Sequence, residues 1–191
     1  MSSINNKENI KTANYIEAII DLIPDVALLK QLYNTLCSFK NLQDANLRIK
    51  ALFTSLLISK EVKKEVLTQL LQEQLDHKKI NYIFTILINN HDFKYLHKII
   101  EKLFLKLLEF EDKNLMQITT ATELEAPQKD KLEEVIYSLG KPANNNIYLK
   151  YQIDEEIQGG YIIHFKDKIY DDSLRRKFSI ANRIINELIT I

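Results

Sequence analysis

Apolar residues recur every three or four positions through the first half of the chain, which is the spacing of helices with one buried face. Short polar stretches separate six such segments. They run over about 9–23, from an Asp25 cap through 39, over 44–57, from a Ser59 cap to about 75, over 79–89 and over 93–110. The break at Pro24 falls between the first two segments, so this half is predicted to be a six-helix bundle.

The pattern changes after a charged joint at 109–113. From here alternating apolar residues, the period of half-buried strands, replace most of the helical spacing. The expected elements are a strand at 116–120, a helix from Pro127 to Leu139, strands at 147–153, 161–165 and 169–171, and a helix after a Ser173 cap. We expect an α+β protein, with an N-terminal helical bundle over 1–111 and a small α/β C-terminal domain over 112–191.

Composition places the chain among globular proteins. Of its 191 residues, 46% are hydrophobic and 27% are charged, and 26 basic residues balance 26 acidic ones. This balance gives no electrostatic reason to expect nucleic acid as a partner. No apolar run reaches the ~18 residues that a membrane span needs, and the start of the chain lacks a signal-peptide pattern. We therefore expect a soluble intracellular protein.

The residue types that support catalysis or bind metals are scattered. Cys37 is the single cysteine and lies in an apolar helical pattern, so we expect a core thiol in a reducing compartment. The histidines lack both the helical spacing of a metal site and a nearby cysteine pair; they are His77, His91, His97 and His164. The acidic groups at 154–156 and 171–172 fall at predicted strand ends, where solvated acids are common. We expect no catalytic residue, no metal ion and no cofactor.

The first and fifth predicted helices are apolar on two faces, although a surface helix is normally apolar on one. Their second faces carry Tyr15, Ala18, Ile19 and Leu22 in the first helix, and Tyr82, Ile86 and Asn89 in the fifth. Either the fifth helix is the centre of the bundle, or the two helices form a groove for an amphipathic helix of a partner. In the second case, the outward-facing lining would include Tyr15, Ala18, Ile83 and Ile86.

Two of the three glycines stand together as Gly159-Gly160, between two predicted strands. The pair lacks the Lys-Ser/Thr of a phosphate loop, and it indicates a bulge or a close approach of backbone. The order of strand, Gly-Gly, strand and Ser-capped helix resembles the C-terminal signature of the F-type ATP synthase delta subunit, the oligomycin-sensitivity-conferring protein family. The matching positions are Asp154, Gly159, Gly160, Asp167, Asp171, Ser173 and Arg175.

The resemblance extends more weakly into the first half. Residues 13–18 resemble the opening helix of the family, and 89–92 fall where the family commonly has Glu-Asn-Gly-Arg. Asn90 is kept, whereas His91 and Asp92 stand in place of the Gly and the Arg.

The resemblance implies a non-catalytic stator subunit, which links the alpha-beta catalytic ring of ATP synthase to the membrane-anchored b subunits of the peripheral stalk. The implied site for the N-terminal helix of an alpha subunit is Tyr15, Ala18, Ile19, Leu22, Ile83, Ile86 and Asn90. The implied C-terminal motif and stalk contact is Gly159, Gly160, Asp171, Ser173 and Arg175. The implied place is the cytoplasmic face of a bacterial plasma membrane, or the matrix side in mitochondria, with attachment through the complex.

Two other classes stay open. A helical RNA-binding adaptor resembling antitermination factors would start with a similar bundle, but the Lys63-Lys64 and Lys78-Lys79 pairs are too sparse for a basic face. A small enzyme would need a pocket with strongly shifted titratable groups. The basic run at 175–177 crowds the positive end of the last helix, which its dipole disfavours, and this indicates contact with an acidic partner surface.

Overall fold

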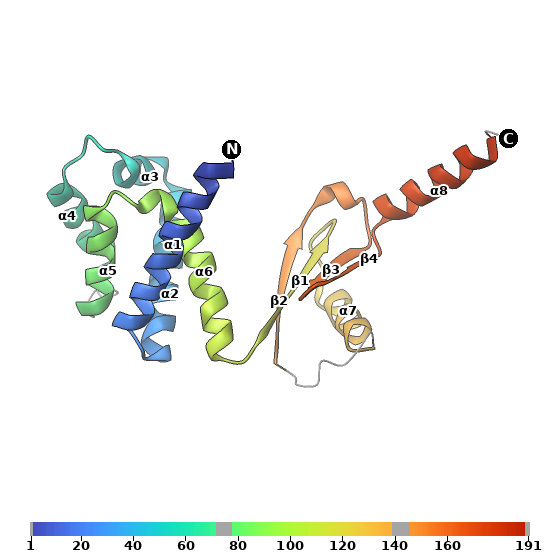
Figure 1. Cartoon of the computed structure of the whole chain (residues 1–191), viewed down its shortest axis with the longest axis horizontal. Coiled ribbons are helices and arrows are strands. Elements are labelled where there is room, and N and C mark those ends of the chain that lie inside the picture. The colour runs from blue at the N-terminus through green and yellow to red at the C-terminus, as the bar shows by residue number, and fades with distance from the viewer. Residues whose placement is uncertain (1, 72–77, 139–145, 190–191) are drawn as a thin grey trace. The chain divides into compact units, whose positions relative to one another are not determined.

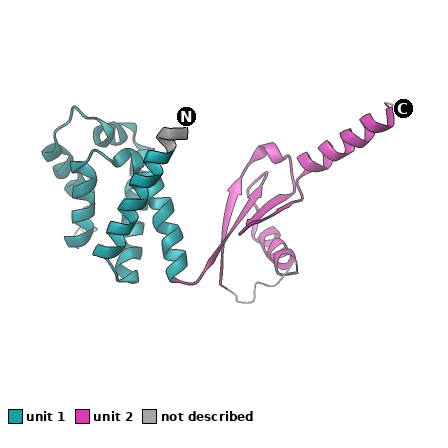
Figure 2. Ribbon diagram, viewed as in Figure 1, with its two compact units in different colours: residues 1–110 teal, residues 111–191 magenta. Residues whose placement is uncertain are grey.

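The computed structural model describes residues 2–71, 78–138 and 146–189. The chain divides into two compact units, residues 1–110 and 111–191 (Figure 2). The boundary expected from the sequence lies one residue later. Independent folding of the two units stays a prediction.

The first unit consists of helices (Figure 1). In chain order they are α1 (Ser2–Leu22), α2 (Val26–Ala45), α3 (Leu47–Thr54), α4 (Lys60–Leu71), α5 (Lys78–Asn89) and α6 (Leu96–Phe110), which follows the short turn η2 (Phe93–Tyr95). The predicted helical half with six segments is confirmed for the described residues. α1 begins earlier than the expected residue 9, and the predicted end of the fourth helix near 75 lies outside the described residues.

The predicted bounds of the third helix were wrong at both ends. A helix was expected over 44–57, but α2 continues through Ala45 and α3 ends at Thr54. Asn46 separates α2 from α3, because its backbone is extended and its side chain accepts a hydrogen bond from the Arg48 amide at 3.0 Å. This N-cap starts a new helix at a point where the apolar spacing alone shows no break.

Phenylalanines from four separate elements meet in the core of the first unit. The ring centroid of Phe39 lies 4.9 Å from that of Phe53, 5.6 Å from that of Phe84 and 5.4 Å from that of Phe93. α5 packs against this core through one face, whose buried residues are Ile80, Ile83, Phe84, Leu87 and Ile88. Aromatic and aliphatic burial of this kind supplies most of the driving force for folding.

A fully buried lysine, Lys63, lies at the edge of this core. Its Nζ donates hydrogen bonds to the carbonyl oxygens of Ser55 at 2.5 Å and Phe53 at 3.3 Å. These carbonyls lie at the C-terminal end of α3, where positive charge is favourable. Burial lowers the pKa of Lys63 below its ordinary value. Lys63 therefore closes a helix end and does not belong to a basic surface.

The second unit is a sheet with one face covered by α7 (Ala126–Ser138). Its strands are β1 (Asn114–Thr120), β2 (Ile147–Ile153), β3 (Tyr161–Phe165) and β4 (Lys168–Asp171). They lie in the order β2-β1-β3-β4, with β1 and β2 parallel and the other neighbours antiparallel. Leu132 and Ile136 of α7 pack with Met116, Ile118 and Ile163 of the sheet.

The final helix, α8 (Leu174–Ile189), follows β4, so the predicted order strand, helix, strand, strand, strand, helix is confirmed (Figure 1). A short turn, η3 (Glu155–Ile157), precedes the glycine pair and was not predicted. The predicted end of the earlier helix at Leu139 lies outside the described residues.

Three features bear on the expected chemistry. None of the described helices is both long enough and apolar enough to cross a membrane. Within 2–71, 78–138 and 146–189, His, Cys, Asp and Glu side chains do not gather in threes that could hold a metal ion. Cys37, which was expected to be a core thiol, is a free thiol that is half-buried.

Candidate partner-binding sites

A groove of about 660 Å³ lies between α1 and α5. It is lined by all seven residues that were assigned to this site from the sequence, namely Tyr15, Ala18, Ile19, Leu22, Ile83, Ile86 and Asn90. The lining also includes Lys11, Asn14, Asp21 and Tyr82, which were not assigned to it. The structure thus joins the second faces of the two helices in one concave surface.

Two of the seven residues form the floor of the groove. Ile19 and Ile83 are each 3% exposed and belong to the core of the first unit. The prediction that Ile83 faces outward was therefore wrong: it lies three residues after Ile80 and four before Leu87, on the buried face of α5. Ile86 is half-buried and lies toward the rim. α5 accordingly combines the two alternatives, because it packs in the core with one face and bounds the groove with the other.

A buried carboxylate organises one end of the groove. Asp92, which is 1% exposed, accepts a hydrogen bond from the Tyr15 hydroxyl at 2.6 Å and an ion-paired one from Lys11 Nζ at 2.7 Å. The Tyr15 hydroxyl in turn accepts a hydrogen bond from Asn90 Nδ2 at 2.9 Å. Burial, together with the hydrogen bond to Asp92, raises the pKa of Tyr15 to about 12. The side chains at this end are therefore fixed before any partner binds.

The turn that delivers Asp92 to this network is built on a left-handed residue. His91 has a φ of 55°, its amide donates to the Ile88 carbonyl at 3.1 Å, and the Asp92 amide donates to the Leu87 carbonyl at 3.0 Å. These two bonds form a Schellman motif, which usually has Gly in the left-handed position. Asp92 was not predicted as a groove residue, although its place directly after the fifth helix was noted.

The glycine pair joins the sheet to the start of α8. Gly160 has a φ of 74°, and a Cβ there would lie 2.3 Å from the backbone oxygen of Asp172. The Gly159 carbonyl accepts a hydrogen bond from the Leu174 amide at 3.0 Å, and the Tyr161 carbonyl accepts one from the Asp172 amide at 2.9 Å. The predicted close approach of backbone is thus present, and it clamps the first turn of α8 against the start of β3.

Asp171 and Ser173 hold the same junction from the other side. The Ser173 hydroxyl, fully buried, accepts a hydrogen bond from the Arg176 amide at 3.2 Å, which is the predicted N-cap. Asp171 Oδ1 accepts one from the Ser173 amide at 2.9 Å, and the hydrogen bonds to Ser173 lower the pKa of Asp171. Arg176 Nη1 donates to the Asp171 carbonyl at 2.8 Å. These residues therefore position α8, and they leave Arg175 exposed beside them.

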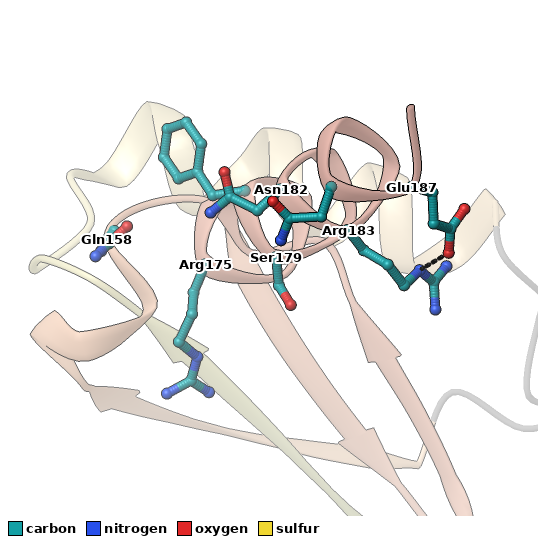
Figure 3. Close-up of a pocket in the computed structure, with 8 residues that line it drawn as sticks. Gln158, Arg175, Ser179, Asn182, Arg183 and Glu187 are labelled. Carbon is teal, nitrogen blue, oxygen red and sulfur yellow. Dashed lines mark ion pairs between the residues drawn. The ribbon is translucent and has the colours of Figure 1, made fainter. Parts of the chain in front are cut away.

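α8 has no buried residue along its length. One side carries exposed apolar residues. An open hollow of about 910 Å³ is lined mainly by polar residues of α8, together with Phe178 (Figure 3). Figure 3 shows Arg175, Asn182 and Arg183 projecting from α8, with Gln158 on the neighbouring turn. Arg175 Nη1 lies 3.8 Å from a carboxylate oxygen of Glu156, so its guanidinium is only loosely held.

These features define a binding protein with two separate surfaces, one in each unit. The chain matches the family described as ATP synthase delta (OSCP) subunit over residues 12–184, and it belongs to this family.

Similar proteins span nearly the whole chain. The ATP synthase subunit delta of Desulforudis audaxviator (strain MP104C) is 25% identical over 177 residues, which are 92% of this chain and 94% of that protein. The sodium-ion-specific ATP synthase subunit delta of Propionigenium modestum is 29% identical over 169 residues, 88% of this chain and 94% of that protein. A chain in the cryo-EM structure of the Toxoplasma gondii mitochondrial ATP synthase hexamer has the same fold, with a TM-score of 0.57 and 18% identity over 93% of this chain and 97% of that one.

As a member of this family, the chain is a non-catalytic subunit of the F-type ATP synthase. It is the stator subunit that connects F1 to the peripheral stalk, and it is peripheral to the membrane through the complex. A protein that makes this connection needs two binding surfaces and no reaction centre. The RNA-binding adaptor and the small enzyme are therefore set aside.

Proposed function

We propose that the groove between α1 and α5 binds the N-terminal helix of an alpha subunit, so that the first unit caps the alpha-beta ring of F1. The observation that supports this most directly is the single groove lined by all seven residues to which the family resemblance gave this role. Its rim keeps apolar side chains partly exposed, among them Leu22, Tyr82 and Ile86. Such a rim suits the apolar face of an amphipathic helix.

The spacing along α1 also favours a helical partner. Tyr15, Ala18 and Leu22 are three and four residues apart, and they form one stripe along the helix. Ala18 is the smallest side chain of this stripe and is exposed. A small side chain at this point lets the backbone of a second helix approach α1 closely, while Tyr15 and Leu22 contact its flanks.

The test is the affinity of the full chain for a synthetic peptide containing the first residues of the alpha subunit from the same organism. Ala18→Leu fills the groove, and we expect it to weaken binding by about tenfold or more while the unfolding midpoint stays unchanged. Ala51→Leu is the matched control, because Ala51 is also exposed but lies in α3. Wild-type affinity of Ala18→Leu would contradict the proposal.

For the second unit, we propose contact with the distal ends of the b subunits through α8 and Arg175. The supporting observations are a helix without a buried residue and an exposed guanidinium beside its N-terminus. The Arg175→Glu variant should lose the C-terminal segment of the b subunit in a pull-down and keep its unfolding midpoint. Full binding by this variant at physiological salt would count against the stalk contact.

We also propose that the complex holds this chain at the cytoplasmic face of a bacterial plasma membrane. The bacterial delta subunits among its relatives support this placement over the mitochondrial matrix side. Fractionation of the source cells should find the chain on membranes until F1 is stripped from them at low salt. A chain recovered from mitochondria would favour the alternative.

A further inference from the structure

Two adjacent leucines lie in solvent on the segment 55–59, which joins α3 to α4 and which we call the leucine turn. Leu57 is 98% exposed and Leu56 is 74% exposed, and Val62 in the first turn of α4 is a further exposed apolar residue. Figure 1 shows this connection as a loop at the edge of the first unit. Single exposed leucines are common, but this adjacent pair contributes almost no buried apolar area to the fold of its own chain.

The backbone of the leucine turn is fixed, although its leucines are exposed. The buried Lys63 donates hydrogen bonds from its Nζ to two carbonyl oxygens at the C-terminal end of α3. The Leu57 amide donates to the Ser55 hydroxyl at 3.1 Å, and the Ser59 hydroxyl caps the start of α4. Little conformational entropy is therefore lost when a partner covers the pair, which is a property of residues that dominate the energy of an interface.

The sequence around the leucine turn has a local excess of positive charge. Residues 47–64 contain five basic residues and a single acidic one, Glu61, whereas basic and acidic residues are balanced in the chain as a whole. The basic residues are Arg48, Lys50, Lys60, Lys63 and Lys64, and all of them except Lys63 are at least partly exposed. An apolar pair with positive charge beside it is complementary to an apolar surface with carboxylates beside it.

The leucine turn is connected to the polar end of the groove through the core. The ring centroid of Phe53, two residues before the turn, lies 4.9 Å from that of Phe93, and Phe93 directly follows Asp92. Both belong to one compact unit. A partner that places a helix in the groove therefore brings its neighbouring surface close to the leucine turn.

We infer that the leucine turn is a second contact of the first unit with F1, and that Leu56 and Leu57 insert into an apolar depression with acidic side chains beside it on the alpha-beta ring. The inference rests on the proposed function of the groove, which places the first unit on F1. A single helix in a groove leaves the unit free to turn about the axis of that helix. A second contact beside the groove fixes the orientation of the unit, as resistance to the torque of rotation requires.

The test compares two affinities of the full chain, measured by surface plasmon resonance. One is for F1 from the same organism, freed of its own copy of this subunit, and the other is for the alpha-subunit peptide. Leu57→Asp should weaken binding to F1 by about thirtyfold and leave the affinity for the peptide unchanged. The matched control is Leu105→Asp, the same change at an exposed leucine of α6, which should alter either affinity by no more than about twofold. Circular dichroism checks that both variants are folded.

Lys60→Glu tests the positive charge separately. Lys60 lies three residues after Leu57, and a glutamate in the first turn of α4 interacts favourably with the helix dipole, so the variant should stay folded. Its affinity for F1 should be about tenfold weaker than that of the wild type at low salt, and the difference should shrink as the salt concentration rises. An affinity that stays the same or increases would overturn the acidic surface on F1.

The other outcomes separate the leucine turn from the groove. Wild-type affinity of Leu57→Asp for F1 would overturn the second contact and leave the proposed function of the groove in place. Loss of the alpha-subunit peptide by Leu57→Asp would mean that the turn acts only through the groove, and it would also overturn the second contact. Failure of the wild-type chain to bind both F1 and the peptide would overturn both claims. Self-association that Leu57→Asp abolishes, measured by sedimentation equilibrium, would identify a second copy as the occupant and overturn the contact with F1.

Discussion

The groove between α1 and α5 and the exposed apolar side of α8 are both apolar surfaces, but the chain supports them in different ways. Ile19 and Ile83 under the groove are each 3% exposed, and buried Asp92 holds Tyr15 and Lys11 at its end. α8 has no buried residue. The groove is thus formed before binding, whereas the apolar side chains of α8 lie open to solvent.

Substitutions in the two surfaces should therefore act differently. A preformed site is part of the core beneath it, so changes there affect folding as well as binding. A helix that is anchored at one end contributes little to the folding of its own unit, and its side chains matter when a partner is present. Less conformational entropy is lost when the bound geometry already exists, so binding in the groove should also order fewer side chains than binding along α8.

The largest contrast should come from the same substitution at two isoleucines. Ile83→Asp places an unpaired charge in the core under the groove, and we expect a loss of more than about 4 kcal/mol in unfolding free energy. Ile185→Asp in α8 should cost no more than about 0.5 kcal/mol. Urea unfolding of both variants provides the measurement. Equal losses of unfolding free energy would remove the distinction between the preformed groove and the exposed side of α8.

Ile86→Asp gives the intermediate case. Ile86 is half-buried at the rim, so its loss of stability should be smaller than that of Ile83→Asp, while peptide binding should be abolished. A variant at Ile86 that unfolds as severely as the one at Ile83 would place this side chain in the core.

A second prediction concerns the anchor of α8. In Gly160→Val the new Cβ would lie 2.3 Å from the backbone oxygen of Asp172, and the valine would have to adopt a positive φ. We therefore expect a loss of about 3 kcal/mol in the stability of the second unit. Gly159→Ala is the comparison, because its Cβ meets the movable end of the Leu174 side chain at 2.8 Å and should cost less. Hydrogen exchange of β3 and α8 reports the effect. A harmless Gly160→Val would mean that the junction does not clamp the helix.

The order of strands and helices along the chain could be predicted, because alternation and three-to-four spacing leave direct marks in the sequence, whereas the order β2-β1-β3-β4 within the sheet was not predicted. The ends of the helices could not be predicted in this way. Asn46 ends α2 and starts α3 through its own backbone and side chain, although the apolar spacing continues on both sides of it.

The residues that line the groove could be predicted, but not which of them form its buried floor and which its exposed rim. Two apolar faces on one helix indicate that both make contacts. Periodicity does not say which face is buried in the core, so Ile83 was assigned to the surface. The Tyr15–Asp92 hydrogen bond joins residues 77 positions apart, and only the fold brings them together. The exposure of α8 could not be predicted from its sequence either, because a buried amphipathic helix shows a similar apolar stripe.

A third prediction tests whether the polar end of the groove is fixed in advance. Tyr15→Phe removes one hydrogen bond from buried Asp92 and should cost about 1.5 kcal/mol. The folded-state pKa of Tyr15 is raised from 10.0 to about 12, so this contribution is complete below pH 10 and is lost as the pH rises toward 12. The stability difference between wild type and Tyr15→Phe should therefore shrink over this interval. A difference that grows with pH would contradict the hydrogen bond to Asp92.

The smallest expected effect is a gain in the stability of the first unit. His91 has a φ of 55°, and its buried Nδ1 has no hydrogen-bond partner among the described residues, so His91→Gly should stabilise the first unit by about 0.7 kcal/mol. His91→Ala removes the ring but keeps the Cβ, and it should show no such gain. Thermal unfolding of both variants separates the backbone effect from the loss of the imidazole. Equal stability of the two would mean that the left-handed turn costs nothing here.

A connection between F1 and the peripheral stalk requires that one chain carry two independent surfaces for two partners. Native mass spectrometry tests this directly, on the full chain mixed with two peptides. One peptide is the N-terminal segment of the alpha subunit, and the other is the C-terminal segment of the b subunit. We predict a complex with one copy of each, from which Ala18→Leu removes only the alpha peptide and Ile185→Asp removes only the b peptide. Displacement of one peptide by the other, or loss of both from a single variant, would contradict two independent surfaces.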